Sequence, residues 1–172
     1  YSNLIFRLND LSNTNTPDIP VLKVLQQDLN AQYLLAQMSA YRGMTRMDIY
    51  YFMLKKEVWP EDFARIENNN DMYNSMRAEL IDKASPAVVK DFRKMEESNE
   101  HHITEDFIRN TIRTRKIDTL FNADSWWDNS SLAVDQLKQL QTAIMNKVDR
   151  DARVISKKES DLKTRYLVAL VL

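Results

Sequence analysis

Glycine is almost absent from this chain, which has one glycine and four prolines in 172 residues. Because glycine most readily adopts the positive φ angles found in tight turns, the chain can contain few turns of that kind. Good helix formers such as Leu, Ala, Met, Gln, Glu, Lys and Arg are plentiful, and no strand pattern competes with them. The sequence therefore predicts an all-α protein.

The first long helix is expected between two proline signals. Residues 10–20 are rich in Asn, Ser, Thr and Pro, and their prolines interrupt any helix that precedes them. From Pro20 no helix breaker occurs before Trp59, which gives a helix of about ten turns. Its expected core stripe has a three-to-four spacing and consists of Leu22, Leu25, Leu29, Ala36, Gly43, Tyr50 and Met53.

Two later prolines mark the starts of the next helices, because proline is well tolerated in a first helical turn. Pro60 is followed by two acidic residues, and we expect this second helix to last to about Lys83. A third helix should begin at Pro86, bend near residues 98–102 and end around Phe121.

The fourth helix is expected to start at Trp126, after a Ser125 N-cap, and to continue to the end of the chain. Trp126 and Trp127 are interpreted as packing anchors at the tip of the bundle. The stripe of this helix consists of Leu137, Leu140, Ile144, Val148, Ile155, Leu162 and Tyr166. Short connections force antiparallel neighbours, so the prediction is an antiparallel up-down-up-down four-helix bundle with long first and last helices.

The two ends of the chain suggest a membrane receptor. Residues 166–172 are uncharged and apolar, and they follow a polar and basic stretch, as at the start of a transmembrane helix that needs ~20 such residues. A C-terminal core helix is the alternative. We therefore divide the chain into a membrane-proximal helix and linker (residues 1–16), a helical-bundle sensor domain (17–165) and the start of a transmembrane helix (166–172).

Charge and cysteine content exclude several classes of function. The 24 Lys and Arg residues nearly balance the 25 Asp and Glu residues, so no general positive field favours nucleic acid. The absence of cysteine removes disulfides, thiol nucleophiles and thiolate metal sites. No Ser-His-Asp order, phosphate loop or general-acid pair stands out, and the sequence predicts a protein that is not an enzyme.

The only glycine lies in the middle of the first helix, between Arg42 and Arg46. Glycine inside a helix costs about 1 kcal/mol relative to alanine, so Gly43 requires a reason. Small side chains there either let another helix approach closely or leave a pocket, and an arginine in that pocket would need an anionic partner. The alternatives are an anion-binding site and close packing, with Arg42 paired to a carboxylate of the bundle.

Other arginines are expected at the same height of the bundle. Arg42 lies 17 residues before Trp59, Arg77 lies 17 after Pro60, and Arg109 lies 17 before Trp126. Antiparallel stacking therefore brings these arginines to one layer, where convergent guanidinium groups would bind a small oxyanion or carboxylate. The count does not fix the rotation of each helix. The basic cluster that includes Arg109 and Arg113 can equally be a solvated face.

A patch of carboxylates and imidazoles on the third helix has the i, i+3 and i, i+4 spacing of metal ligands. Its members are Glu96, Glu97, Glu100, His101, His102 and Glu105. A dinuclear metal site would need a matching Glu and His set on a second helix, and both histidines of the chain lie in this patch. We therefore interpret it as a solvated bend and predict neither a metal nor a cofactor.

Residues 37–46 and 125–137 carry a family resemblance. The first segment resembles the first-helix motif of the nitrate- and nitrite-sensing (NIT) helical domains and related four-helix sensors of bacterial chemoreceptors, with a Gln and an Arg-Gly pair. The second resembles the later signature of that family, a Trp-aromatic pair before an Ile-Asp-x-Leu-like helix. The resemblance covers about residues 25–145, and Tyr41 stands where the family usually has an acidic residue. It implies that Arg42 contacts an anion, with Arg109 or Arg113 as the second contact.

These observations predict the periplasmic ligand-binding domain of an inner-membrane methyl-accepting chemotaxis receptor, working as a homodimer. The expected ligand is a small anion: nitrate or nitrite, an organic acid or an amino acid. The site residues are Arg42, Gly43, Arg46, Arg77, Arg109 and Arg113. The alternatives are a helical interaction or coiled-coil scaffold without a ligand, and a metal-dependent bundle enzyme that uses the Glu and His patch.

Overall fold

The computed structural model describes residues 20–55, 59–118 and 121–171, with side chains from 22 to 157 in those ranges. Five helices and no strand occur within these residues, which confirms the all-α prediction. The predicted membrane-proximal helix in residues 1–16 lies outside the described residues. The helices are α2 (Pro20–Lys55), α3 (Pro60–Lys83), α4 (Pro86–Glu96), α5 (Asn99–Thr114) and α6 (Ala123–Val171).

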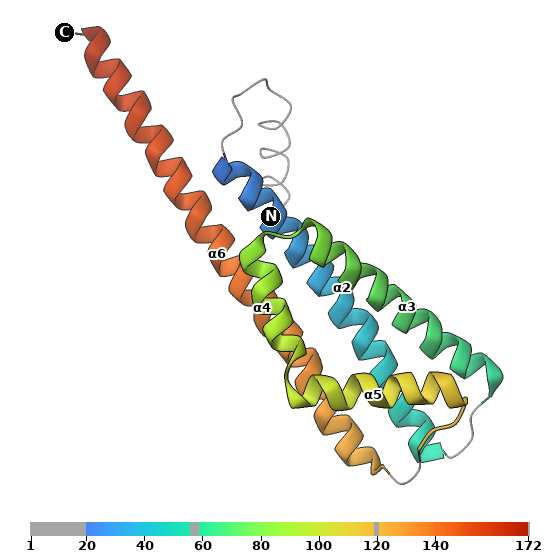
Figure 1. The fold of residues 1–172 in the computed structure, drawn as a ribbon. Helices are drawn as coiled ribbons and strands as arrows, with labels where there is room; N and C mark the ends of the chain where they lie inside the picture. The colour runs from blue at the N-terminus through green and yellow to red at the C-terminus, as the bar shows by residue number, and fades with distance from the viewer. Residues whose placement is uncertain (1–19, 56–58, 119–120, 172) are drawn as a thin grey trace.

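The two long helices α2 and α6 form the centre of the molecule, and α2 also packs along α3 (Figure 1). The hairpin of α2 and α3 is antiparallel, as the short connection predicted. Helix α4 lies along α6, whereas α5 crosses the bundle at a steep angle and reaches from α6 to α3. The far half of α6 extends well beyond the turn between α3 and α4.

The predicted third helix is two helices. Ser98 has extended backbone angles, and its hydroxyl accepts a hydrogen bond from the backbone N–H of His101 at 3.3 Å, which begins a new helix. The predicted bend at residues 98–102 is confirmed, but the end near Phe121 is wrong. Helix α5 ends at Thr114, because Arg115 adopts a left-handed conformation with φ of 50°.

The core stripe predicted for α2 lies at one edge of the true core. Leu25 is buried, but Gly43 and Tyr50 are only half-buried. The centre of the buried face consists of Leu25, Ala31, Leu34, Leu35, Met38, Ile49 and Phe52. Apolar residues occur on two faces of α2, so spacing alone did not distinguish the face that packs inward.

The stripe of α6 is confirmed at Leu137, Ile144 and Val148, which are all buried. Helix α6 begins at Ala123, three residues before the predicted start, and the side chain of Asn122 accepts a hydrogen bond from the N–H of Asp124 at 2.8 Å. Among the described residues, no helix has a stretch both long and apolar enough to cross a bilayer.

Candidate ligand-binding site

Arg42 points from the middle of α2 into the bundle and is 2% exposed. Its guanidinium group forms an ion pair with the carboxylate of Glu105 on α5 and donates a 3.4 Å hydrogen bond to the Asn70 side chain on α3. It also stacks on the ring of Tyr73, with 3.7 Å between the guanidinium carbon and the ring centroid. The predicted alternative, pairing with a carboxylate of the bundle, therefore describes this arginine.

Tyr73 of α3 is almost fully buried beneath this guanidinium group. Burial raises the pKa of its hydroxyl to about 12, although the positive charge of Arg42 acts in the opposite direction. Among the described residues, no group forms a hydrogen bond of good geometry with this hydroxyl. It is thus a neutral donor enclosed by the bundle, because its oxygen has almost no solvent-accessible surface.

Glu105 connects the buried arginine to the surface, because its side chain is 20% exposed. One of its carboxylate oxygens lies 3.8 Å from Nε2 of His101, one helical turn earlier in α5. Burial lowers the pKa of His101, and the charge of Arg42 lowers it further, against the opposing effect of Glu105. His101 is therefore neutral at pH 7.

A polar groove of about 470 Å³ opens on the outer side of this cluster, between α3 and the junction of α4 and α5. Its walls carry arginines, glutamates and both histidines, so charges of both signs face a bound molecule. The lining residues are Tyr73, Asn74, Arg77, Arg93, Glu96, Glu97, His101, His102, Glu105 and Arg109. We call this the arginine groove.

Arg77 is the arginine of the groove with a paired carboxylate contact to Glu96. It forms a two-pronged ion pair with Glu96, in which the Nη2 to Oε2 distance is 3.0 Å, and this hydrogen bonding raises its pKa. Arg109 stands at the rim, 74% exposed, with its guanidinium group 3.3 Å from Asp106. Arg42, Arg77 and Arg109 thus lie in the same region of the bundle, as predicted. Arg42 lies inside the bundle, whereas Arg77 and Arg109 lie at its surface.

The remaining predicted residues lie outside the groove lining. Arg46 packs between α2 and α6: it donates a 2.9 Å hydrogen bond to Ser131, and its guanidinium carbon lies 4.3 Å from the ring centroid of Trp127. Arg113 is exposed and bonds to Asn110 at 2.9 Å. A Cβ atom added to Gly43 would meet nothing within 4 Å, so none of the other described helices approaches it closely.

The tryptophan pair divides between two roles. Trp126 is fully buried, and its indole N–H donates a 3.1 Å hydrogen bond to the carbonyl of Arg46, which confirms it as a packing anchor. Trp127 is 36% exposed and covers Arg46 from outside. It does not line the arginine groove.

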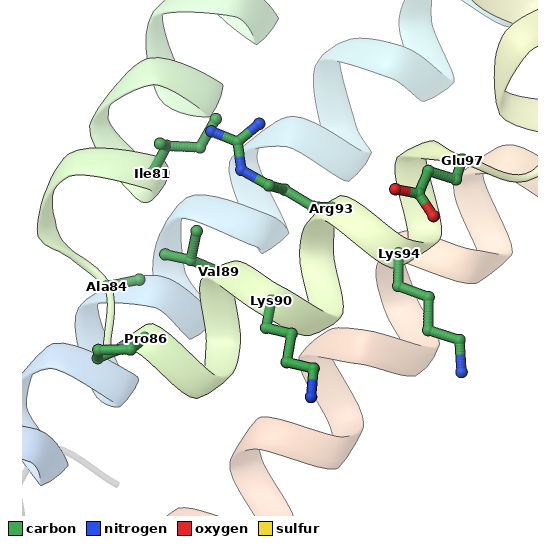
Figure 2. A pocket seen from close by; sticks show the side chains of 8 residues that line it. All are labelled: Ile81, Ala84, Pro86, Val89, Lys90, Arg93, Lys94 and Glu97. Carbon is green, nitrogen blue, oxygen red and sulfur yellow. The ribbon is translucent and has the colours of Figure 1, made fainter.

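A second hollow lies next to the arginine groove, on the outer side of the turn between α3 and α4. Figure 2 shows an apolar floor that includes Ile81 and Val89, with Arg93 reaching toward α3 while Lys90 and Lys94 point away from it. Arg93 and Glu97 line both hollows. This hollow offers fewer polar groups than the arginine groove, because its floor is apolar and its charged residues are two lysines, Arg93 and Glu97.

Two groups of contact residues were not predicted. Tyr73 and Asn70 have no distinguishing spacing, and their roles depend on the rotation of α3 against α2. Buried Asp28 accepts hydrogen bonds from Ser85 at 2.5 Å and from Lys147 at 2.7 Å, joining three parts of the chain. The only available sequence signal for this second cluster was an acidic residue between the apolar residues Leu25 and Leu29 of α2.

Most residues of the Glu and His patch line the arginine groove. Within the described residues, no group of three or more His, Cys, Asp or Glu side chains is arranged to hold a metal ion. Glu96 and Glu105 instead pair with Arg77 and Arg42, and Glu100 accepts a 3.4 Å hydrogen bond from Gln136. In comparisons with known proteins, no family model, curated protein or solved structure matches the chain.

Proposed function

We propose that this chain is the ligand-sensing domain of a bacterial transmembrane receptor of the chemoreceptor type, and that the arginine groove binds its ligand. The observation that carries the proposal is the connection between groove and core. Glu105 lines the groove and also neutralises Arg42, which lies inside the bundle. A ligand that competes for either charge therefore acts on the packing of the helices.

The ligand that fits this groove is a small carboxylate or oxyanion. Arg77 has two parallel N–H donors, which bond to Glu96 in this structure and match the carboxylate of a ligand. Arg93 and Arg109 add positive charge at the rim. The glutamates of the groove can accept an ammonium group, so amino acids belong to the same class as organic acids, nitrate and nitrite.

Ligand binding would act through the junction of α4 and α5. An anion that takes the place of Glu96 on Arg77 frees the last residue of α4, and one that draws Arg42 from Glu105 loosens α5. Both helices pack against α6. The ligand shifts α6 only if it binds one arrangement of these helices more tightly than the other.

The proposal places the domain on the periplasmic side of an inner membrane, with α6 continuing toward that membrane. In the complete sensor we expect an antiparallel four-helix bundle in which α4 and α5 together serve as the third helix. The length of α6, 49 residues, supports this proposal, because a rod longer than its neighbours suits transmission out of the bundle.

The test is a thermal-shift screen of the 172-residue chain against nitrate, nitrite, organic acids and amino acids. A ligand that binds the native state raises the melting temperature. We expect one class of small anion to do so. Arg77→Ala should need at least a tenfold higher concentration of that anion for the same rise in melting temperature. Arg113→Ala, an exposed arginine outside the groove, is the matched control and should bind normally.

A helical scaffold without a small-molecule ligand is the second candidate function, and one observation favours it. Tyr33, Met47, Tyr51 and Leu54 on the outer face of α2 each expose half or more of their surface. Such residues are typical of protein contacts. The arginine groove would be rejected as a ligand-binding site if no compound raised the melting temperature, or if Arg77→Ala bound the ligand as well as the wild type. The scaffold function would then be the better explanation.

A further inference from the structure

The outer face of α2 is apolar over three heptads. Between residues 33 and 54 every exposed residue of this helix is uncharged: Tyr33, Ala40, Met44, Met47, Tyr51 and Leu54. With half-buried Gln37 they alternate in steps of four and three, the spacing of a coiled-coil seam. The seam lies opposite the buried face that holds Met38, Arg42 and Ile49.

Helix α3, the neighbour of α2, provides an internal reference for a solvated helix. Its exposed residues are polar, charged or small: Pro60, Glu61, Ala64, Arg65, Asn68, Asp71, Asn74, Ser75, Ala78, Asp82 and Lys83. Water exposure alone therefore does not account for the apolar seam of α2. A helix that is apolar on two opposite faces is buried on both sides in its working state.

Gly43 gives an independent indication of a partner. A Cβ atom added at this position would meet no other described atom within 4 Å outside its own turn of helix. Glycine is thus not required by packing within the molecule, although it weakens the helix. It lies at the edge of the seam with Ala36 and Ala40, and small residues in that arrangement allow a second helix to approach closely.

We infer that α2 is the dimerisation helix, and that two copies of this chain pack their α2 seams against each other in parallel around a two-fold axis. A two-fold axis requires a self-complementary surface, and an uninterrupted seam without charge meets that requirement. Lys23 and Gln26 at one end and Lys55 at the other form the polar rim. The parallel orientation rests on the proposed function, because two receptors in one membrane point the same way.

The size of the seam sets the strength of this contact. Its five large side chains expose between 44% and 61% of their surface, which makes on the order of 500 Å² per copy available. About 1,000 Å² in total is below the range of strong complexes. We therefore expect a dimer that forms at roughly 100 µM protein and dissociates on dilution to the low micromolar range.

The absence of cysteine makes the orientation directly testable. In a parallel pair each seam residue faces its own copy, so Ala40→Cys and Met47→Cys should each form a disulfide-linked dimer under mild oxidation. Ala78→Cys, an exposed alanine on α3, is the matched control and should cross-link at least tenfold more slowly. Cross-linking only in a mixture of the two seam variants would indicate an antiparallel pair and overturn the proposal.

Analytical ultracentrifugation of the cysteine-free chain supplies the second measurement. We expect Met47→Glu to raise the dissociation constant at least tenfold with an unchanged circular dichroism spectrum, and Ala78→Glu to leave it unchanged. A wild-type chain that remains monomeric at several hundred micromolar overturns the proposal, as does a monomer that binds phosphatidylcholine vesicles through this face. Neither measurement involves a ligand, so failure here is separate from failure of the arginine groove.

Discussion

Arg42 and Arg109 lie near the same groove, yet they belong to different physical environments. Arg42 is 2% exposed, carries an ion pair with Glu105 and stacks on Tyr73. Arg109 is 74% exposed and only lies near Asp106, one turn away. Counting residues from the helix ends assigned both arginines to one layer of the bundle. The rotation of each helix about its axis decides whether the arginine side chain is buried or exposed.

Removing the buried arginine should have the largest effect on folding. Arg42→Ala leaves Glu105 without its cation and Tyr73 without its stacked partner, so we expect a loss of about 3–5 kcal/mol in the free energy of unfolding. Urea denaturation followed by circular dichroism measures it. Arg113→Ala is the control. A loss below about 1 kcal/mol would mean that Arg42 is not the centre of the buried network.

Asp28→Asn sharpens the comparison, because Asp28 is a buried carboxylate that does not line the arginine groove. The asparagine keeps an acceptor for Ser85 but loses the charge that pairs with Lys147. We expect the free energy of unfolding to fall by about 1–3 kcal/mol. Asp151→Asn, which removes the exposed partner of the same lysine, is the control, and equal losses in both variants would contradict a special role of burial.

The buried histidine predicts a smaller, pH-dependent effect. Burial lowers the pKa of His101 in the folded state below the ordinary value of 6.5. The unfolded chain therefore binds the proton more tightly, and stability falls as the pH decreases from about 6.5 toward the folded pKa. Urea midpoints between pH 5.5 and 7.5 should show this slope in the wild type and in His102→Gln, but not in His101→Gln. An unchanged slope in His101→Gln would assign the effect to other groups.

Arg109→Ala should have the smallest effect. An exposed pair of this kind contributes little, so we expect a change within about 0.5 kcal/mol in urea denaturation. A loss comparable with that of Arg42→Ala would break the comparison, because it would mean that Arg109 takes part in the buried network in solution.

Local signals predicted the helices well. Pro60 and Pro86 mark the helix starts, and the periodic stripe of α6 correctly identified its buried side. The break at Ser98 was expected only as a bend, because a serine N-cap is a weaker signal than proline. The start of α6 was missed by three residues, since Asn122 rather than Ser125 caps it.

Features that depend on pairing between distant segments could not be predicted. Arg42 and Glu105 are 63 residues apart, and neither residue indicates its partner. The same holds for Asp28 and Lys147, which are 119 residues apart. On α2 the spacing rule found apolar residues but not which face they serve, because both the core and the outer seam follow a similar period.

The burial of the first half of α6 has a mechanical consequence. Trp126, Leu137 and Val148 are all buried, so the bundle holds the first half of this helix of 49 residues, and neither proline nor glycine interrupts it afterwards. At 1.5 Å per residue the helix continues for roughly 35 Å beyond Val148. A tilt of about 3° at Val148 displaces the far end by roughly 2 Å. In the proposed receptor this continuation would turn a small angular change at the edge of the core into a larger displacement at its end.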